Sequence, residues 1–377
     1  MKILLYSSVF FPSLGGIETI SATLATNLTK LGHECTVITE TPINTDEQNI
    51  YKVIRQPTWK ERLTLTRKFD IVHSNGASIA LYPFAKLSSK PFIWTHNGYQ
   101  VSCVDGLGWV DGEPTPMTPL ASLAYHFRKK GLFSSLKESV KLGVRRYVAN
   151  HVDLNIAATN WVAKRQPLQN QVVAYTPYPL NRFKDAKKIN HNCKYDFIYV
   201  GRLVSEKGIP DLIQAFKLLI TTPGFTDKRL AIVGSGNMQA KLEEMVKELN
   251  LELNVSFLGP KYGSELTDLI SMAKIGIIPS AYEEPMGGVS LELLAAGKNV
   301  IVSEFGGLAE CVGNAGLKFK NRDVNALYEC MDKILSEKDL AEQQLELADT
   351  RLKIFDEVKL TEKYVEIYER VIKKYKK

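Results

Sequence analysis

A chain of 377 residues exceeds the length that one hydrophobic core usually serves, so two domains are expected. Its 45% hydrophobic and 24% charged residues are typical of a folded globular protein and argue against a disordered or integral membrane protein. The five cysteines are scattered and show neither metal-ligand nor disulfide spacing. The net charge of +7 suits phosphorylated small molecules, an anionic membrane or nucleic acid, and it does not distinguish among these partners.

The first half of the chain predicts an open parallel sheet with helices on both faces. Residues 2–41 predict a strand, a glycine-bearing turn, a helix and a second strand. Further short apolar strands are expected at 70–73, 91–95 and 154–158, with stretches between them long enough for crossover helices. The opening apolar run is too short for a signal peptide and lacks a cleavage site, so we expect a cytoplasmic protein.

A basic segment, residues 128–146, precedes the last of these strands. It contains seven cations: Arg128, Lys129, Lys130, Lys137, Lys141, Arg145 and Arg146. The last four are spaced to form one helical stripe beside an apolar stripe of Leu136, Val140, Val144 and Val148. Such a face suits an anionic membrane surface, which would make the protein peripheral on the inner face of the membrane. A solvated helix face above a core stripe explains the pattern equally well.

The second half repeats the sheet pattern after residues 178–194, a polar stretch without steady periodicity that we interpret as a linker. Five short β-branched runs, each followed by a helical segment, predict a second doubly wound domain over 195–355, after a first domain over 1–177. Residues 356–377 predict a helix that packs back on the N-terminal domain through Leu360, Tyr364, Ile367, Tyr368 and Ile372. Because ligands bind at the carboxyl ends of parallel strands, the two domains are expected to face a central cleft.

Two cations follow the first strand of the second domain. Arg202 comes directly after that strand, and Lys207 lies five residues further on, at the start of a helix. Fixed cations beside helix amides are suited to a diphosphate. A solvated turn in which Glu206 pairs with Lys207 has about equal weight.

Two carboxylates flank a pair of glycines later in the same domain. Glu284 follows a strand, Gly287 and Gly288 come next, and Glu292 lies on the helix that begins there. The glycines let backbone amides approach a phosphate, and carboxylates beside such a site are suited to sugar hydroxyls. The alternatives are an exposed loop charge for Glu284 and a dipole-stabilised acid of the first helical turn for Glu292.

Together these pieces resemble the retaining GT-B glycosyltransferases of glycosyltransferase family 4. The resemblance covers roughly residues 198–312 and rests on GRLVSEKG, VGSGN, the Glu284 to Glu292 spacing, AAGKNVI and GGLAE, in the family's order. It implies a GT-B fold of two Rossmann-like domains. This chain departs from the family by having Met286 where Phe is frequent and Asn299 where Pro is usual. A dinucleotide fingerprint and a P-loop are both absent.

The resemblance also implies roles for individual residues. Arg202 and Lys207 would bind the donor diphosphate, Glu292 the ribose and Glu284 the donor hexose. His96 would lie near the donor sugar and the reaction centre, although a core or capping histidine is an alternative. The remaining donor residues that it implies are Gly15, Gly16, Gly201, Gly234, Leu258, Gly259, Pro260, Tyr262, Met286, Gly287, Gly288 and Val289. For Gly15 and Gly16, a tight turn between strand and helix is the alternative.

The predicted function is retaining transfer of a hexose, by the resemblance most often from UDP-glucose, in polysaccharide or cell-envelope biosynthesis. The acceptor would be a glycan or a lipid-linked oligosaccharide. No DxD-like motif sits in the expected place and the phosphate site is already cationic, so we expect neither a metal nor another cofactor. One alternative is a nucleotide-sugar epimerase of the same fold. A non-enzymatic nucleic-acid or membrane binding protein is the other, but we expect no nucleic-acid partner, because that interpretation leaves the two carboxylates unexplained.

Overall fold

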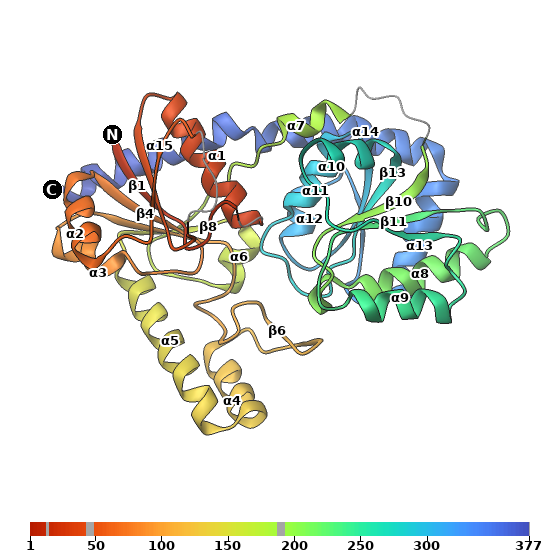
Figure 1. Ribbon diagram of the computed structural model, residues 1–377, viewed down its shortest axis with the longest axis horizontal. Helices are drawn as coiled ribbons and strands as arrows, with labels where there is room; N and C mark the ends of the chain where they lie inside the picture. Colours follow the sequence, from red (N-terminus) through yellow and green to blue (C-terminus); the bar gives the residue numbers. More distant parts are fainter. Residues whose placement is uncertain (13–14, 43–48, 187–192, 377) are drawn as a thin grey trace. The chain divides into compact units, whose positions relative to one another are not determined.

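The computed structural model describes residues 1–12, 15–42, 49–186 and 193–376 and forms two compact units (Figure 1). Unit 1 comprises Met1–Gly108, Thr115–Pro179 and Phe355–Lys377, and unit 2 comprises Trp109–Pro114 and Leu180–Ile354. Part of the predicted glycine turn (13–14) and part of the predicted linker (187–192) lie outside the described residues, as does the side chain of Lys130.

Unit 1 is built on a seven-stranded parallel sheet with the order β3-β2-β1-β4-β5-β8-β9. Its strands are β1 (Lys2–Tyr6), β2 (Glu34–Thr39), β3 (Lys52–Arg55), β4 (Ile71–Asn75), β5 (Phe92–His96), β8 (Leu154–Ala157) and β9 (Gln171–Val173). Strands are added on both sides of β1, which makes the sheet doubly wound, as predicted. The edge strands β3 and β9 escaped prediction because they are short and only partly buried.

Helices cover both faces of this sheet because β1 is buried on both sides (Figure 1). Ile3 and Leu5 belong to one core cluster, and Leu4 and Tyr6 to the other. The helices of unit 1 are α1 (Gly16–Lys30), α2 (Trp59–Lys68), α3 (Tyr82–Leu87), α4 (Pro119–Lys130), α5 (Leu132–His151), α6 (Asn160–Arg165) and α15 (Glu357–Tyr375).

The C-terminal helix α15 packs on unit 1, which confirms the prediction. Its residues Tyr364, Ile367, Tyr368 and Val371 are buried in the same cluster as Ile3 and Leu5. The Tyr368 hydroxyl is 2.7 Å from His73 Nδ1. Because its apolar residues recur at helical spacing, one face of α15 completes the core that α1 leaves open.

Unit 2 has a six-stranded parallel sheet with the order β12-β11-β10-β13-β14-β15. Its strands are β10 (Tyr195–Val200), β11 (Leu230–Val233), β12 (Val255–Phe257), β13 (Ala273–Ile278), β14 (Asn299–Ser303) and β15 (Leu317–Phe319). The five predicted strands are all present, whereas β15 was missed because it has three residues and is half-exposed.

The helices of unit 2 are α7 (Asn181–Lys184), η2 (Ser205–Lys207), α8 (Ile209–Thr221), α9 (Gln239–Glu248), α10 (Gly263–Ser271), α11 (Gly288–Ala295), α12 (Gly307–Val312), α13 (Val324–Ser336) and α14 (Lys338–Leu352), followed by η3 (Lys353–Phe355). The short helix α7 lies inside the predicted linker and belongs to unit 2. Among the described helices, none is long and apolar enough to cross a lipid bilayer.

A hairpin from the predicted first domain groups with unit 2 instead. Strands β6 (Trp109–Val110) and β7 (Glu113–Pro114) form it. Trp109 Nε1 donates to Ser205 Oγ at 3.0 Å, and Arg322 lies 3.4 Å from Glu113 and above the Trp109 ring. These contacts explain why the first domain, which was expected to run continuously over 1–177, is interrupted at this hairpin.

Candidate functional site

Glycines bring the loops at the carboxyl ends of the unit 2 strands into close contact. Gly208, which precedes α8, has φ 65°, and a Cβ there would lie 2.0 Å from the Pro279 carbonyl oxygen. Gly234, after β11, has φ 142°, and its Cβ would lie 1.8 Å from the Gly201 carbonyl oxygen. Any other residue would push these loops apart, so the predicted strand ends meet only because glycine occupies both positions.

Lys207 and Glu284 form an ion pair across two of these loops. The Nζ to Oε1 distance is 2.7 Å, and the side chains are 17% and 10% exposed. Ser280 also donates its hydroxyl to Glu284 Oε1, and Lys207 Nζ lies 5.5 Å from the centre of the Tyr282 ring. Glu284 is therefore not an exposed loop charge, and the geometry joins two residues that the sequence separates by 77 positions.

The alternative in which Glu206 pairs with Lys207 is not what the structure shows. Glu206 Oε1 lies 3.2 Å from Arg202, whose side chain is 65% exposed. The Glu206 backbone carbonyl accepts from the Ala281 amide at 3.0 Å and so connects the loop after β10 to the loop after β13. Arg202 therefore presents its guanidinium toward solvent, on the same loop as Lys207.

The second predicted carboxylate, Glu292, is buried on α11 and paired with a cation that the sequence did not indicate. Arg182, on α7, lies 3.2 Å from Glu292 Oε1, and the two side chains are 48% and 6% exposed. The Arg182 guanidinium also lies above the Phe183 ring. Helix α11 has no acid in its first turn, so Glu292 is not the dipole-stabilised acid of the alternative interpretation. A buried carboxylate requires such a partner.

The start of α11 differs in one respect from the expectation. The Gly287 amide donates to Cys311 Sγ at 3.2 Å, so it is not directed at a ligand as predicted. The cause is close packing, because a Cβ on Gly287 would lie 2.6 Å from Ser290 Oγ. Gly288 and Val289 begin the helix and are half-buried, and their amides have no acceptor within α11.

Asn321 organises the same loops and was missed by the sequence analysis. Its Nδ2 lies 3.1, 3.3 and 3.1 Å from the carbonyl oxygens of Ser280, Tyr282 and Phe305. Its Oδ1 accepts from the Phe305 amide at 2.8 Å. One side chain thus joins the loops after β13 and β14. Nothing in its local sequence distinguishes it from an ordinary turn asparagine.

The other predicted donor residues of unit 2 lie at the ends of β10, β11 and β12 or on the loop before α11. Gly201 donates its amide to the Val233 carbonyl at 3.0 Å, and Gly234 donates to the Gly259 carbonyl at 2.9 Å. Pro260 and Tyr262 are exposed, and the half-buried residues are Leu258, Gly259 and Met286. All of them lie at the carboxyl-end side of the sheet, where the prediction expected them.

In unit 1, His96 ends β5 and is buried. Its Nε2 lies 2.8 Å from Asn155 Oδ1, while Asn155 Nδ2 donates to the Ala149 and Gln169 carbonyls. Nε2 must therefore carry the proton, and the buried Nδ1, which has no partner among the described residues, is an acceptor. Burial lowers the pKa of His96 to about 4, so the ring is neutral at pH 7.

A chain of neutral polar side chains lies beside His96. Asn97 Nδ2 donates to Asn75 Oδ1 at 2.6 Å, and Asn75 Nδ2 donates to Ser21 Oγ at 2.8 Å. Asn97 Oδ1 is buried and, within the described part of the chain, has no hydrogen-bond donor. Asn75 and Asn97 were not predicted, although both end or follow strands at the edge where ligands of open sheets bind.

Gly15 and Gly16 begin α1. A Cβ on Gly15 would lie 2.7 Å from Glu18 Oε2, and Gly16 has open space around it. Gly15 has an extended backbone with φ -175°, and the buried Glu18 carboxylate lies against it. Their approach to a donor stays a prediction.

The basic segment does not form the predicted stripe. Helix α5 packs on unit 1 through the opposite face, where Leu142 and Ala149 are buried. Arg146 turns away and donates to the Val101 carbonyl at 3.0 Å, and Arg145 is half-buried. Lys137 and Lys141 remain exposed. The expected row of four cations is therefore not formed. The alternative of a core stripe is wrong for Leu136, Val140 and Val144, because these side chains are exposed.

The described residues include no group of three or more His, Cys, Asp or Glu side chains that could hold a metal ion.

Both halves of the chain are similar to known protein families. Residues 181–350 match the family described as Glycosyl transferases group 1, and residues 14–166 match Glycosyltransferase Family 4. The fold is similar to that of Anabaena HepE, solved in complex with UDP and glucose, with a TM-score of 0.75 and 18% identity over 98% of this chain and 99% of that one. The chain has the GT-B fold.

Two curated relatives show how far the similarity extends. The chain is 24% identical to an uncharacterized 42.6 kDa protein in the cps region of Klebsiella pneumoniae, over 98% of this chain and 100% of that protein. It is 36% identical to a glycogen synthase of Mycobacterium tuberculosis over 160 residues, which are 42% of this chain and 38% of that protein. The match therefore spans little more than a third of the length of such locally similar relatives.

Proposed function

We propose that this protein transfers a hexose from a nucleotide diphosphate sugar to a glycan or lipid-linked oligosaccharide acceptor. The observation that carries the proposal is the Lys207–Glu284 pair, held at 2.7 Å beside the start of α11. A cation, a carboxylate and helix amides together suit the junction between a diphosphate and a sugar. Each component alone has commoner structural explanations.

Lys207 is suited to the diphosphate even though it is already paired. An ammonium has three donors, and Glu284 accepts only one of them. The exposed Arg202 supplies a second cation on the same loop. As the donor sugar departs, charge builds on the diphosphate, and fixed cations stabilise it without reorganisation. We propose that this clamp acts without a metal ion.

The two carboxylates would bind hydroxyl groups. In the proposal Glu284 accepts from the donor hexose and Glu292 from the ribose, with Arg182 paired to the buried Glu292. In unit 1, His96 Nδ1 and Asn97 Oδ1 are acceptors that find no donor among the described residues, and they therefore also suit sugar hydroxyls. The proposed reaction retains the anomeric configuration, with the departing phosphate taking the proton of the acceptor hydroxyl.

UDP-glucose is the proposed donor and polysaccharide or cell-envelope biosynthesis the proposed setting. HepE was solved with UDP and glucose and also with UDP-glucose, and the chain has a glycogen synthase and a protein in a cps region among its relatives. These names support the choice of donor base and of glycan acceptor.

Ligand-induced stabilisation tests the donor. UDP at a hundredfold excess over its Kd should stabilise the protein by about 2.7 kcal/mol, whereas GDP and ADP should not. Chromatography of UDP-glucose reactions, with and without glycan acceptors, then separates the activities. Stabilisation by GDP alone would contradict the proposal that the donor carries uracil. Conversion of UDP-glucose to an isomer without acceptor would instead support a nucleotide-sugar epimerase.

A further inference from the structure

The α4–α5 hairpin carries nearly all of the chain's excess positive charge. Residues 115–151 contain seven lysines and arginines but one acid, Glu138, which is a net charge of +6 in a chain whose total is +7. In Figure 1 the hairpin extends away from the sheet of unit 1. The positive charge is therefore a local property of one surface element and not a general feature of the protein.

Helix α5 also exposes a continuous apolar stripe. Leu136, Val140, Val144 and Tyr147 recur at intervals of four, four and three residues and are 54%, 59%, 48% and 61% exposed. These intervals place them on one helical face. Single exposed aliphatic residues are ordinary on a protein surface, whereas four in a row on one face usually mark an interaction site.

Cations border this stripe. Lys137 and Lys141 are exposed and follow Leu136 and Val140 directly in sequence, so they lie at the edge of the apolar face. Lys141 is 3.6 Å from Glu138, the single acid of the hairpin, in a weak exposed pair. The long lysine side chains can bend toward a polar phase while the apolar stripe beside them enters a less polar one.

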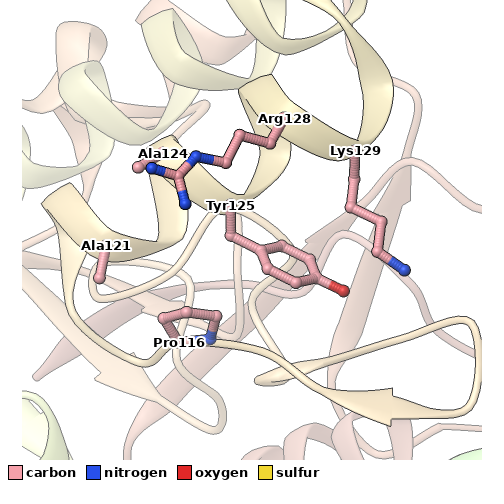
Figure 2. A pocket seen from close by; sticks show the side chains of 6 residues that line it. All are labelled: Pro116, Ala121, Ala124, Tyr125, Arg128 and Lys129. Carbon is pink, nitrogen blue, oxygen red and sulfur yellow. The ribbon is translucent and has the colours of Figure 1, made fainter.

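Helix α4 adds a surface pocket of the same chemical character. The pocket has a volume of about 470 Å³ and is lined by Pro116, Ala121, Ala124, Tyr125, Arg128 and Lys129 (Figure 2). All of these except Pro116 come from α4, and Figure 2 shows the two cations on the same helical turn as each other, next to Tyr125. Apolar walls with cations at the edge suit a phosphate-bearing lipid headgroup and the start of its chains.

We propose that the α4–α5 hairpin docks unit 1 on a bilayer that contains anionic lipids. The exposed stripe of α5 enters the interfacial region, and Lys137, Lys141, Arg128 and Lys129 contact the anionic headgroups. A nucleic acid would use the cations but leave the aliphatic stripe in water. The surface contains none of the proposed donor residues, so it stands or fails independently of the proposed function.

Vesicle flotation of the full chain tests the proposal. The protein should float with vesicles of equal parts phosphatidylcholine and phosphatidylglycerol, but not with phosphatidylcholine alone, and raised salt should weaken binding. Failure to float with the anionic vesicles, or equal flotation with both kinds, would overturn the proposal. So would tight binding to duplex DNA under conditions in which the protein ignores the vesicles.

Two sets of variants separate the apolar and ionic contributions. Val140→Asp, and separately Leu136→Asp, should weaken vesicle binding about tenfold or more, because a charge then occupies the inserted stripe. Lys137→Glu with Lys141→Glu should weaken it by a similar factor and reduce its salt dependence. Since all four positions are exposed, the melting temperature should stay close to that of the unaltered protein.

Matched controls come from unit 2. Leu253→Asp introduces the same charge at a fully exposed leucine, and Lys247→Glu with Lys338→Glu reverses two exposed lysines. Both should float like the unaltered protein. If Val140→Asp and Leu136→Asp bind as tightly as Leu253→Asp, α5 is not the docking surface and the proposal is wrong.

Discussion

The edges formed by the carboxyl ends of the strands differ in their charged groups between the two units. In unit 2 the predicted cations stand beside carboxylates, with Lys207 next to Glu284 and Arg202 next to Glu206. In unit 1 the ends of β4 and β5 present Asn75, a neutral His96 and Asn97. Paired charges suit a ligand with both phosphate and hydroxyl groups, whereas neutral acceptors suit hydroxyls alone. The same doubly wound sheet therefore supports two kinds of site.

The largest effect on this contrast is expected from removal of the Lys207 cation in unit 2. Lys207→Ala should lower turnover on the order of 100-fold or more, because the developing charge on the departing diphosphate loses its fixed partner. Steady-state kinetics with the identified donor measure this. Lys274→Ala is the matched control, because it breaks the 2.9 Å pair with Asp196 elsewhere in unit 2. Equal rates in Lys207→Ala and Lys274→Ala would remove Lys207 from the site.

The neutrality of His96 predicts a pH dependence of stability. The pKa of His96 is about 4 in the folded protein and about 6.5 in the unfolded chain. Between these two pH values the unfolded chain therefore binds more protons than the folded protein. The free energy of unfolding should thus fall as pH falls from 7 to 5, with about 2 kcal/mol due to His96. Urea unfolding of the unaltered protein and of His96→Gln at both pH values isolates this share.

Another buried histidine contributes in the same pH range. Burial lowers the pKa of His73 to about 3, so some pH dependence should survive in His96→Gln. His151→Gln, at an exposed position, is the matched control for the substitution itself. Identical pH profiles in the unaltered protein and His96→Gln would mean that folding does not lower the pKa of His96, and the contrast between the two units would fail.

Arg182 tests whether the second ion pair of unit 2 also serves the donor. Arg182→Ala should raise the Kd for the nucleotide about tenfold, because Glu292 loses a charge-assisted hydrogen bond that holds it in place. The effect is moderate because the Arg182 side chain is 48% exposed and solvent weakens the pair. Isothermal titration with the nucleotide measures the change. Arg182→Lys keeps the charge and should recover part of the affinity. Unchanged affinity in Arg182→Ala would make the pair purely structural.

Asn321 gives the smallest expected effect and separates positioning from stability. Asn321→Ala should lower the free energy of unfolding by about 1 kcal/mol and also reduce turnover, because the loop that holds Glu284 is released. Asn254→Ala removes a comparable amide that donates to the Thr226 and Lys228 carbonyls. It should match the loss of stability without changing turnover. A matching loss of turnover in Asn254→Ala would exclude a special role for Asn321.

Much of the fold was predictable because the signals are local. Short β-branched runs followed by helical periodicity identified both sheets, and the periodic stripe of α15 identified a helix that packs on unit 1. The strands that escaped, β3, β9 and β15, are short edge strands with little burial, so their sequences carry weak patterns. Periodicity also found α5 but not its buried face, since Leu136 and Leu142 are equally apolar.

The sequence by itself determined two doubly wound units and the glycines at the strand ends, and it singled out Lys207, Glu284 and Glu292 as candidate residues, because these depend on residue type and short spacing. Only the tertiary structure decided which charged side chains form ion pairs. Glu284 joins Lys207 over 77 positions and Glu292 joins Arg182 over 110. Such pairs depend on how parallel strands bring distant loops to one edge, which no local pattern records.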